Sequence, residues 1–206
     1  MRSILVVVQF CVSAILIISS LIILKQLNYI KSKDLGFDQD ALISVRVFPS
    51  AAIGGIDIQQ IRNIRTEFEK ISGVAGTTAV SNLPGGQFDQ HNVFISNQPD
   101  ENQDVSEMYV SCDFEKVFDF ELVEGRAFDN SFAIDSAGKS VIVNESFVKN
   151  LNLKEAVGTK ISWNSNKLDR KIDVTIVGVL KDFHYRPLHE EIQPVAIQLS
   201  EQDVDY

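Results

Sequence analysis

The feature that most constrains this chain is an uncharged apolar run near its N-terminus. Ile4–Leu24 reads ILVVVQFCVSAILIISSLIIL, which is 21 residues without a charged side chain. As an α-helix this run would rise about 31 Å, which matches the hydrocarbon thickness of a bilayer. A cleavable signal peptide has a shorter apolar core of roughly 7–15 residues and a small-residue cleavage site, and no such site follows here. We therefore predict one retained transmembrane helix over residues 1–24.

The segment after the apolar run predicts a stalk that ends in a turn. Residues 25–33 read KQLNYIKSK, with Leu27 and Ile30 three positions apart, which is typical of a helix that continues out of the membrane. Gly36 lies among clustered aspartates, a composition that favours a turn. Residues 25–40 are therefore interpreted as stalk and turn.

Charge restricts the partners of the region that follows. The formal net charge is −9, and the acidic residues are scattered rather than gathered in one block. Nucleic acid and anionic head groups require a basic face, so neither is an expected partner of the globular part. The positive-inside rule alone would place the C-terminal side in the cytoplasm, because Arg2 precedes the run while Lys25, Lys31 and Lys33 follow it. Large following domains translocate largely regardless of such charges, so this count leaves the orientation open.

Residues 41–206 predict an α+β fold with a mixed sheet. Helical signals are few and do not alternate strictly with the strands, which favours α+β over a parallel α/β fold. A strand at 41–48, a helix at 57–71 and a strand at 74–80 would form a βαβ-like unit, with a second subdomain interleaved in the sequence. A helical turn is expected at 114–118 and a short helix at 145–151, which Asn144 would begin as the N-cap. A hairpin-like excursion is expected over 85–103, around the short apolar stretch 93–95, and a loop over 129–138. Further strands are predicted at 105–111, 140–143, 159–163, 172–180 and 194–199, with extended chain at 120–123.

The helix predicted over Asp57–Ile71 has the clearest periodicity in the chain. Asp57 with Gln60 forms a plausible capping box, and Gly73 suits a left-handed residue after the last turn. An apolar stripe recurs at steps of three and four, which predicts that one face of the helix lies in the core. The stripe consists of Ile58, Ile61, Ile64, Phe68 and Ile71.

Motifs that would indicate a catalytic or cofactor site do not emerge. The chain contains no G-x-x-x-x-G-K-[ST] run and no nucleophile elbow, so no phosphate cradle or serine triad is predicted. His184 and His189 are five residues apart with Pro187 between them, a spacing that does not align two imidazoles on one helix face. Cys11 lies inside the apolar run, so a disulfide with Cys112 is not expected. We predict no catalytic residue, no metal site and no cofactor.

Several stretches together carry a resemblance to a known family. These are the passage VVVQFCVSAILIIS with QLNYIKSKDLGFDQDALISV, then VAGTTAVSNLPGG, FEKVFDFELVEGRAF, VIVNESFVKNL with VGTKI, and finally VGVLKDFHYRPLHEEIQPVAI. In order and spacing they resemble the extracytoplasmic core domain of MacB/FtsX-type ABC-transporter permeases, particularly those of Bacteroidetes-like bacteria. The similarity covers nearly all of the chain, and its last stretch is the most specific.

The resemblance implies a set of signature positions with structural roles, and a division of residues 41–206. Residues 41–84 and about 172–206 would form one subdomain, and 85–171 the other. The signature residues are Gly36, Phe37, Pro84, Gly85, Gly125, Arg126, Asn144, Gly158, Gly178, Lys181, Asp182, Phe183, His184 and Pro194.

The resemblance also implies a function and a location. The chain would be the periplasmic domain of a permease in the bacterial inner membrane, transmitting ATPase-driven motion across the envelope for export or extraction of a substrate. Its partners would be a separate ABC ATPase subunit, a second permease copy and further periplasmic or outer-membrane components. Family permeases continue into more transmembrane helices and no second apolar run follows here, so a fragment or a split gene product is expected.

Two other classes remain open from the residues alone. One span followed by an α+β domain also describes a membrane-anchored extracytoplasmic sensor or ligand-binding domain, which would need a second span and an output domain. An anchored hydrolase would need a pocket that contains an acid–base pair with perturbed pKa values.

Overall fold

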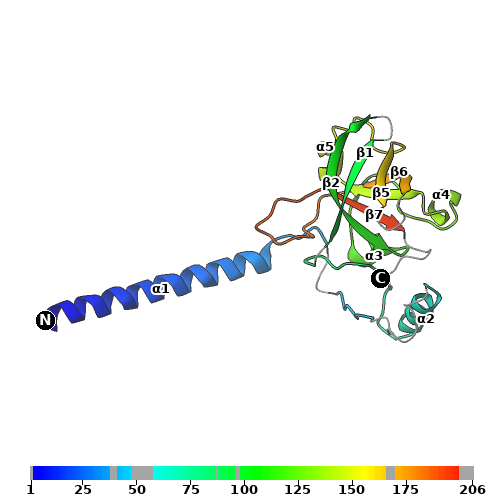
Figure 1. The fold of residues 1–206 in the computed structure, drawn as a ribbon. Helices are drawn as coiled ribbons and strands as arrows, with labels where there is room; N and C mark the ends of the chain where they lie inside the picture. Colours follow the sequence, from blue (N-terminus) through cyan, green and yellow to red (C-terminus); the bar gives the residue numbers. More distant parts are fainter. Residues whose placement is uncertain are drawn as a thin grey trace. The chain divides into compact units, whose positions relative to one another are not determined.

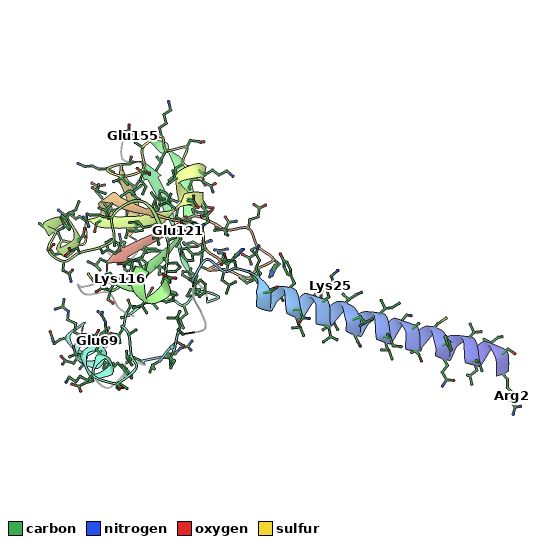
Figure 2. All side chains as sticks on the ribbon, turned by 180° about the vertical axis from the view of Figure 1, so that it is seen from behind. Arg2, Lys25, Glu69, Lys116, Glu121 and Glu155 are labelled. Carbon is green, nitrogen blue, oxygen red and sulfur yellow. The ribbon has the colours of Figure 1, made fainter. Side chains whose placement is uncertain are left out.

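The structure, a computed structural model, describes residues 2–37, 41–47, 58–86, 88–95, 98–165 and 170–199. It divides into two compact units, Met1–Asp34 and Leu35–Tyr206. The first unit is a single helix, α1 (Arg2–Ser32), drawn with its side chains in Figure 2. By length and composition α1 is able to cross a membrane. The predicted apolar helix and its continuation into the stalk are therefore confirmed.

Two hydroxyl groups inside α1 are satisfied by the helix itself. The Ser13 hydroxyl donates to the carbonyl of Gln9 at 2.9 Å, and the Ser20 hydroxyl donates to the carbonyl of Leu16 at 2.8 Å. A hydroxyl bonded to the preceding turn avoids the cost of an unpaired polar group in hydrocarbon. These two serines are therefore compatible with a lipid environment without a partner helix.

The second unit is an α+β domain, and the predicted fold class is confirmed. Its helices are short, and most of its residues in regular structure belong to strands. The helices are α2 (Ile58–Glu69), α3 (Phe114–Phe118), α4 (Ala133–Ser136) and α5 (Glu145–Asn150). The strands are β1 (Asp89–Ile95), β2 (Gln98–Val110), β3 (Leu122–Gly125), β4 (Ser140–Asn144), β5 (Lys160–Ser165), β6 (Arg170–Leu180) and β7 (Val195–Leu199).

The strands form one mixed sheet that curls back on itself (Figure 1). The order is β3-β6-β4-β7-β2-β1-β5, and β5 also pairs with β6, so that the ladder closes. The pairs β2–β7 and β4–β6 are parallel, whereas the other pairs are antiparallel. Closure of this kind leaves few strand edges free to pair with other chains.

Both faces of this sheet carry apolar clusters, which explains the continuous apolar runs in two strands. All five residues of β4 and all five of β7 are buried. Ile142 belongs to one cluster, together with Phe114 of α3, whereas Val143 belongs to the other, together with Phe147 of α5. Alternation of polar and apolar residues is lost because neither face of these strands meets water.

The short helix α5 begins as its sequence predicts. Asn144 is its N-cap, and the Asn144 side chain accepts a hydrogen bond from the backbone N–H of Phe147 at 3.1 Å. The β1–β2 hairpin begins inside the expected excursion over 85–103, but its second strand continues beyond it to Val110. Helix α4 lies in a stretch that the sequence indicated only as a loop. The division of 41–206 into two subdomains stays a prediction.

The strands predicted on either side of α2 differ from the structure. Residues 41–47 belong to no strand, and of residues 74–80 only Val80 forms a bridge, with Val110. The side chain of Ile43 is 91% exposed and that of Val45 is 60% exposed. A strand requires a ladder partner, and in the part of the chain described here no strand lies beside residues 41–47. The strand predicted from the alternating pattern of 41–48 is therefore wrong over 41–47, and residue 48 lies outside the described residues.

Helix α2 forms as predicted, but its apolar stripe is not core. Ile61, Ile64 and Phe68 are half-buried and Ile71 is 53% exposed. The stripe borders a shallow apolar hollow of about 360 Å³. Polar bonds hold the helix to the segment that follows it, since the Arg65 guanidinium donates to the Thr77 carbonyl at 2.8 Å. The predicted cap at Asp57 lies outside the described residues, whereas Gly73 adopts the expected left-handed backbone with φ +96°.

The partial burial of Phe68 makes a testable difference to stability. We expect Phe68→Ala to cost about 1 kcal/mol of unfolding free energy, because only part of its apolar surface leaves water on folding. Phe147→Ala is the matched control: Phe147 is 0% exposed, so its loss should cost about 3–5 kcal/mol. Urea denaturation followed by circular dichroism measures both values. Equal losses for the two variants would contradict the half-exposed placement of α2.

Candidate functional site at the junction between stalk and sheet domain

The residues that follow the stalk are fastened to a distant part of the sequence. The backbone N–H of His184 donates to the carbonyl of Leu35 at 2.8 Å. Gly36 has φ +81°, and a Cβ placed there would lie 3.0 Å from the Asp182 carbonyl oxygen and 3.0 Å from the Phe183 Cα. Two stretches of backbone can approach this closely because glycine has no side chain. We call Leu35–Phe37 with Asp182–His184 the junction.

Phe37, the last of the three residues Leu35–Phe37, contacts an aromatic cluster. The ring centroid of Phe37 lies 6.1 Å from that of Phe118 and 6.0 Å from that of Phe120. Phe120 in turn lies 4.4 Å from Phe183, which is 1% exposed. Aromatic pairs in such geometries contribute about 0.5–1.5 kcal/mol each beyond their buried area. The segment after the stalk is therefore anchored in the core of the sheet domain.

The chain beyond the junction is fixed by Tyr185, a residue that the sequence analysis did not single out. Its hydroxyl donates to the Pro194 carbonyl at 3.1 Å, and its ring lies 4.8 Å from that of Phe88. Its carbonyl accepts from the Gly85 backbone N–H at 2.8 Å. Burial raises the pKa of Tyr185, so the hydroxyl stays protonated and can donate across the physiological range. Tyr185 thus links two signature positions, Gly85 and Pro194.

Asp182 connects the junction to the first turn of α5. One of its oxygens accepts from the Asn144 side-chain amide at 2.8 Å and from the Ser146 backbone N–H at 2.9 Å. The other accepts from the Ser146 hydroxyl at 2.7 Å. Asn144 also accepts from the Val195 backbone N–H at 3.0 Å. Signature residues that lie far apart in the sequence therefore share one hydrogen-bond network.

The other signature residues lie elsewhere in the domain. Gly125 and Gly178 face each other where β3 meets β6, and Gly158 lies in the turn before β5. Lys181 forms an exposed ion pair with Glu121 at 2.6 Å, a kind of contact that contributes at most about 1 kcal/mol. Pro84 precedes Gly85 in the turn that meets Tyr185. Their structural roles remain a proposal.

Arg126 forms a partly buried ion pair that the sequence did not indicate. Its guanidinium donates to both oxygens of Asp135, at 2.6 and 2.9 Å, and lies 4.0 Å from the ring centroid of Phe132. Asp135 also accepts from the Asp129 backbone N–H at 2.9 Å. Burial by itself would raise the pKa of Asp135, but the hydrogen bonds from Arg126 and Asp129 outweigh it and lower that pKa. Asp135 lies in a polar stretch, where nothing in the sequence separates it from surface aspartates.

The geometry of the junction suits mechanical attachment. Its contacts are backbone hydrogen bonds, aromatic packing and a fully bonded carboxylate, and together they hold one segment against another. Of the histidines considered at the sequence level, His189 is 81% exposed beside Glu190, and His184 contributes its backbone to the junction. Within the described ranges, no group of three His, Cys, Asp or Glu side chains is placed to hold a metal ion.

Comparisons with known proteins identify one family model and several solved structures to which this chain is similar. The family model for the MacB-like periplasmic core domain matches residues 6–193. The chain is similar to the periplasmic region of MacB from Actinobacillus actinomycetemcomitans, with 14% identity, 66% of this chain covered and a TM-score of 0.47. It is also similar to the extracellular domain of the ABC-type transporter YknZ from Gram-positive bacteria, with 13% identity, 73% of this chain and 68% of that chain covered, and a TM-score of 0.48.

The matches differ in how much of each chain they cover. This chain covers 54% of the MacB structure, about half of its length. No curated protein matches the chain. The family model nevertheless extends over most of the 206 residues, from the apolar helix to the loop that precedes β7. The chain therefore belongs to the family of the MacB-like periplasmic core domain.

Proposed function

We propose that this chain transmits movement of its transmembrane stalk into the periplasmic domain of a permease that exports or extracts a substrate. The junction is the observation that carries this proposal. Leu35–Phe37 are held by a backbone hydrogen bond, a glycine contact and an aromatic cluster, so a displacement of the chain at Leu35 acts directly on the domain core. Packed cores respond to such displacements by shifting as units because they are dense and nearly incompressible.

The segment that connects helix α1 to the junction is short. Helix α1 ends at Ser32, and only Lys33 and Asp34 separate it from Leu35. A chain spans at most about 3.6 Å per residue, so a linker of two residues cannot absorb a large movement of the helix end. A helix that continues past the apolar run is a stiff element, whereas a long polar linker would decouple the two units.

The other components of this proposal follow from the family. A separate ABC ATPase subunit on the cytoplasmic side would supply the energy, and a second permease copy would complete the unit in the inner membrane. Further periplasmic or outer-membrane components would receive the movement. The domain itself would carry no catalytic group.

A pair of prolines in the stalk tests the proposal. In the intact permease, reconstituted with its ATPase in lipid nanodiscs, hydrogen exchange is followed in a peptide that covers residues 181–186. We expect ATP with vanadate to change this exchange in the parent protein. The double variant Tyr29→Pro and Ile30→Pro should abolish the nucleotide response, because two prolines break the helix.

The control places alanines at the same two positions. The variant Tyr29→Ala and Ile30→Ala keeps the helix and should keep the nucleotide response. Exchange without nucleotide should be the same in all three proteins, since the sheet domain stays folded. A full response in the proline variant would show that the stalk does not carry the movement.

A further inference from the structure

Asp182 forms a polar link between segments that contain residues of the two apolar clusters. Phe183 belongs to the cluster that also packs Phe37 of the junction, whereas Phe147 of α5 belongs to the cluster on the other face of the sheet. Asp182 immediately precedes Phe183, and its carboxylate bonds the residues that begin α5. Asp182 therefore lies between the cluster that contacts the stalk-side segment and the helix that covers the opposite face.

Asp182 both accepts hydrogen bonds from and donates a hydrogen bond to the residues that begin α5. Its carboxylate accepts three hydrogen bonds, from the amide of Asn144 and from the backbone and hydroxyl of Ser146. Its own backbone N–H donates to the Glu145 carboxylate at 3.1 Å. Hydrogen bonds to a charged acceptor are shorter and stronger than those between neutral groups. A shift of residues 182–184 therefore pulls directly on the first turn of α5.

The same network reaches the last strand of the sheet. The Asn144 amide donates to the Gln193 carbonyl at 3.0 Å, and its oxygen accepts from the Val195 backbone N–H. The loop from Asp182 to Pro194 is thus tied at both of its ends to the start of α5. A loop tied in this way moves together with the helix and does not flex independently of it.

The geometry points to Asp182 as the positioning residue that makes α5 follow the junction. This inference rests on the proposed function, because the movement it passes on is the one that the stalk delivers. Coupling between two sites is established when perturbing one changes the energetics of the other through a defined intermediate. Removal of the Asp182 carboxylate should leave both parts formed but independent of each other.

The test is a double-mutant cycle on the 206-residue chain in lipid nanodiscs, without nucleotide. The reporter is hydrogen exchange at the Leu151 backbone N–H, which donates to the Phe147 carbonyl at the end of α5. Phe37→Ala should accelerate this exchange about tenfold when Asp182 is present, as expected for local opening at α5. In the Asp182→Ala background the same change should add less than about twofold.

A control and a milder variant keep the test decisive. The Ala137 N–H in α4 donates to Ala133 and should not respond to Phe37→Ala in either background. If Asp182→Ala does not fold, Ser146→Ala serves as the second background, because it removes only the hydrogen bond from the Ser146 hydroxyl to Asp182. In that background the acceleration of Leu151 exchange by Phe37→Ala should be partly reduced. Asp182→Asn retains one oxygen and should restore some of it. Equal effects of Phe37→Ala in every background would mean that Asp182 only stabilises α5, and would overturn the inference.

The two proposals fail in different ways. A stalk that does not respond to nucleotide would leave the exchange cycle unaffected, because the cycle is measured without nucleotide. Additive effects in the cycle, together with a proline-sensitive nucleotide response, would refute only the role of Asp182.

Discussion

Gly125→Ala is expected to destabilise the sheet domain by about 2–5 kcal/mol, because the added methyl group meets both a steric clash and an unfavourable backbone conformation. A Cβ on Gly125 would lie 2.3 Å from the Val177 carbonyl oxygen and 2.9 Å from the Gly178 Cα. The backbone φ of +79° adds about 1–2 kcal/mol of strain for any residue with a side chain. Relief of the clash requires β3 to separate from β6, and such overpacking costs about 1–3 kcal/mol in addition.

Gly158→Ala is the matched control for this prediction. Gly158 has φ +88°, but a Cβ there meets no atom within 4 Å, so only the strain of about 1–2 kcal/mol remains. Urea denaturation followed by circular dichroism measures the two losses. If Gly125→Ala and Gly158→Ala cost the same, the close contact between β3 and β6 would be wrong.

Asp135→Ala is expected to cost about 2–4 kcal/mol, the second large effect. Asp135 is 1% exposed, and its loss leaves the Arg126 guanidinium and the Asp129 backbone N–H without their acceptor. Removing one partner of a fully buried pair costs about 3–5 kcal/mol; the value is reduced here because 32% of the Arg126 side chain reaches solvent. Glu155→Ala, an exposed substitution on the same domain (Figure 2), should change stability by less than about 0.5 kcal/mol.

The same carboxylate predicts how stability depends on pH. Its pKa is lowered in the folded state, so it contributes stability above its unfolded pKa of about 3.9 and loses that contribution as the pH falls toward the folded pKa. The stability difference between the parent chain and Asp135→Asn should therefore be constant from pH 7 to about pH 5 and shrink below about pH 4. A difference that does not change down to pH 3 would contradict the role of the ionised carboxylate.

Comparison of particular elements shows where sequence reasoning succeeds. Helix α1 and the N-cap of α5 at Asn144 were predicted because their signals are local: an uninterrupted apolar run and a side chain that bonds its own first turn. The strand predicted over 41–48 was wrong for 41–47 because an alternating pattern does not supply a ladder partner. The helical periodicity of α2 was predicted correctly, but periodicity alone does not show whether another surface covers the apolar stripe.

The candidate site divides in the same way. The resemblance selected Gly36, Asp182 and His184, but nothing in the sequence indicated that they meet. Tyr185 and Asp135 were missed because a buried donor or a buried carboxylate is identified by the groups around it. The hydrogen-bond partner of Tyr185 and the full burial of Asp135 are seen only in the fold. The residues next to an aspartate in a polar stretch of sequence do not reveal whether its side chain faces water or an arginine.

The sequence by itself determined the long apolar helix α1, the α+β class and the family, because apolar length, periodicity and the order of motifs are properties of the linear chain. Only the tertiary structure decided that Leu35–Phe37 bind the segment at Asp182–His184, that β5 closes the sheet onto β6, and that Asp182 reaches α5. These contacts join residues far apart in the chain. They form where the collapse of two apolar clusters brings backbone groups together, since each buried polar group then has to find a partner.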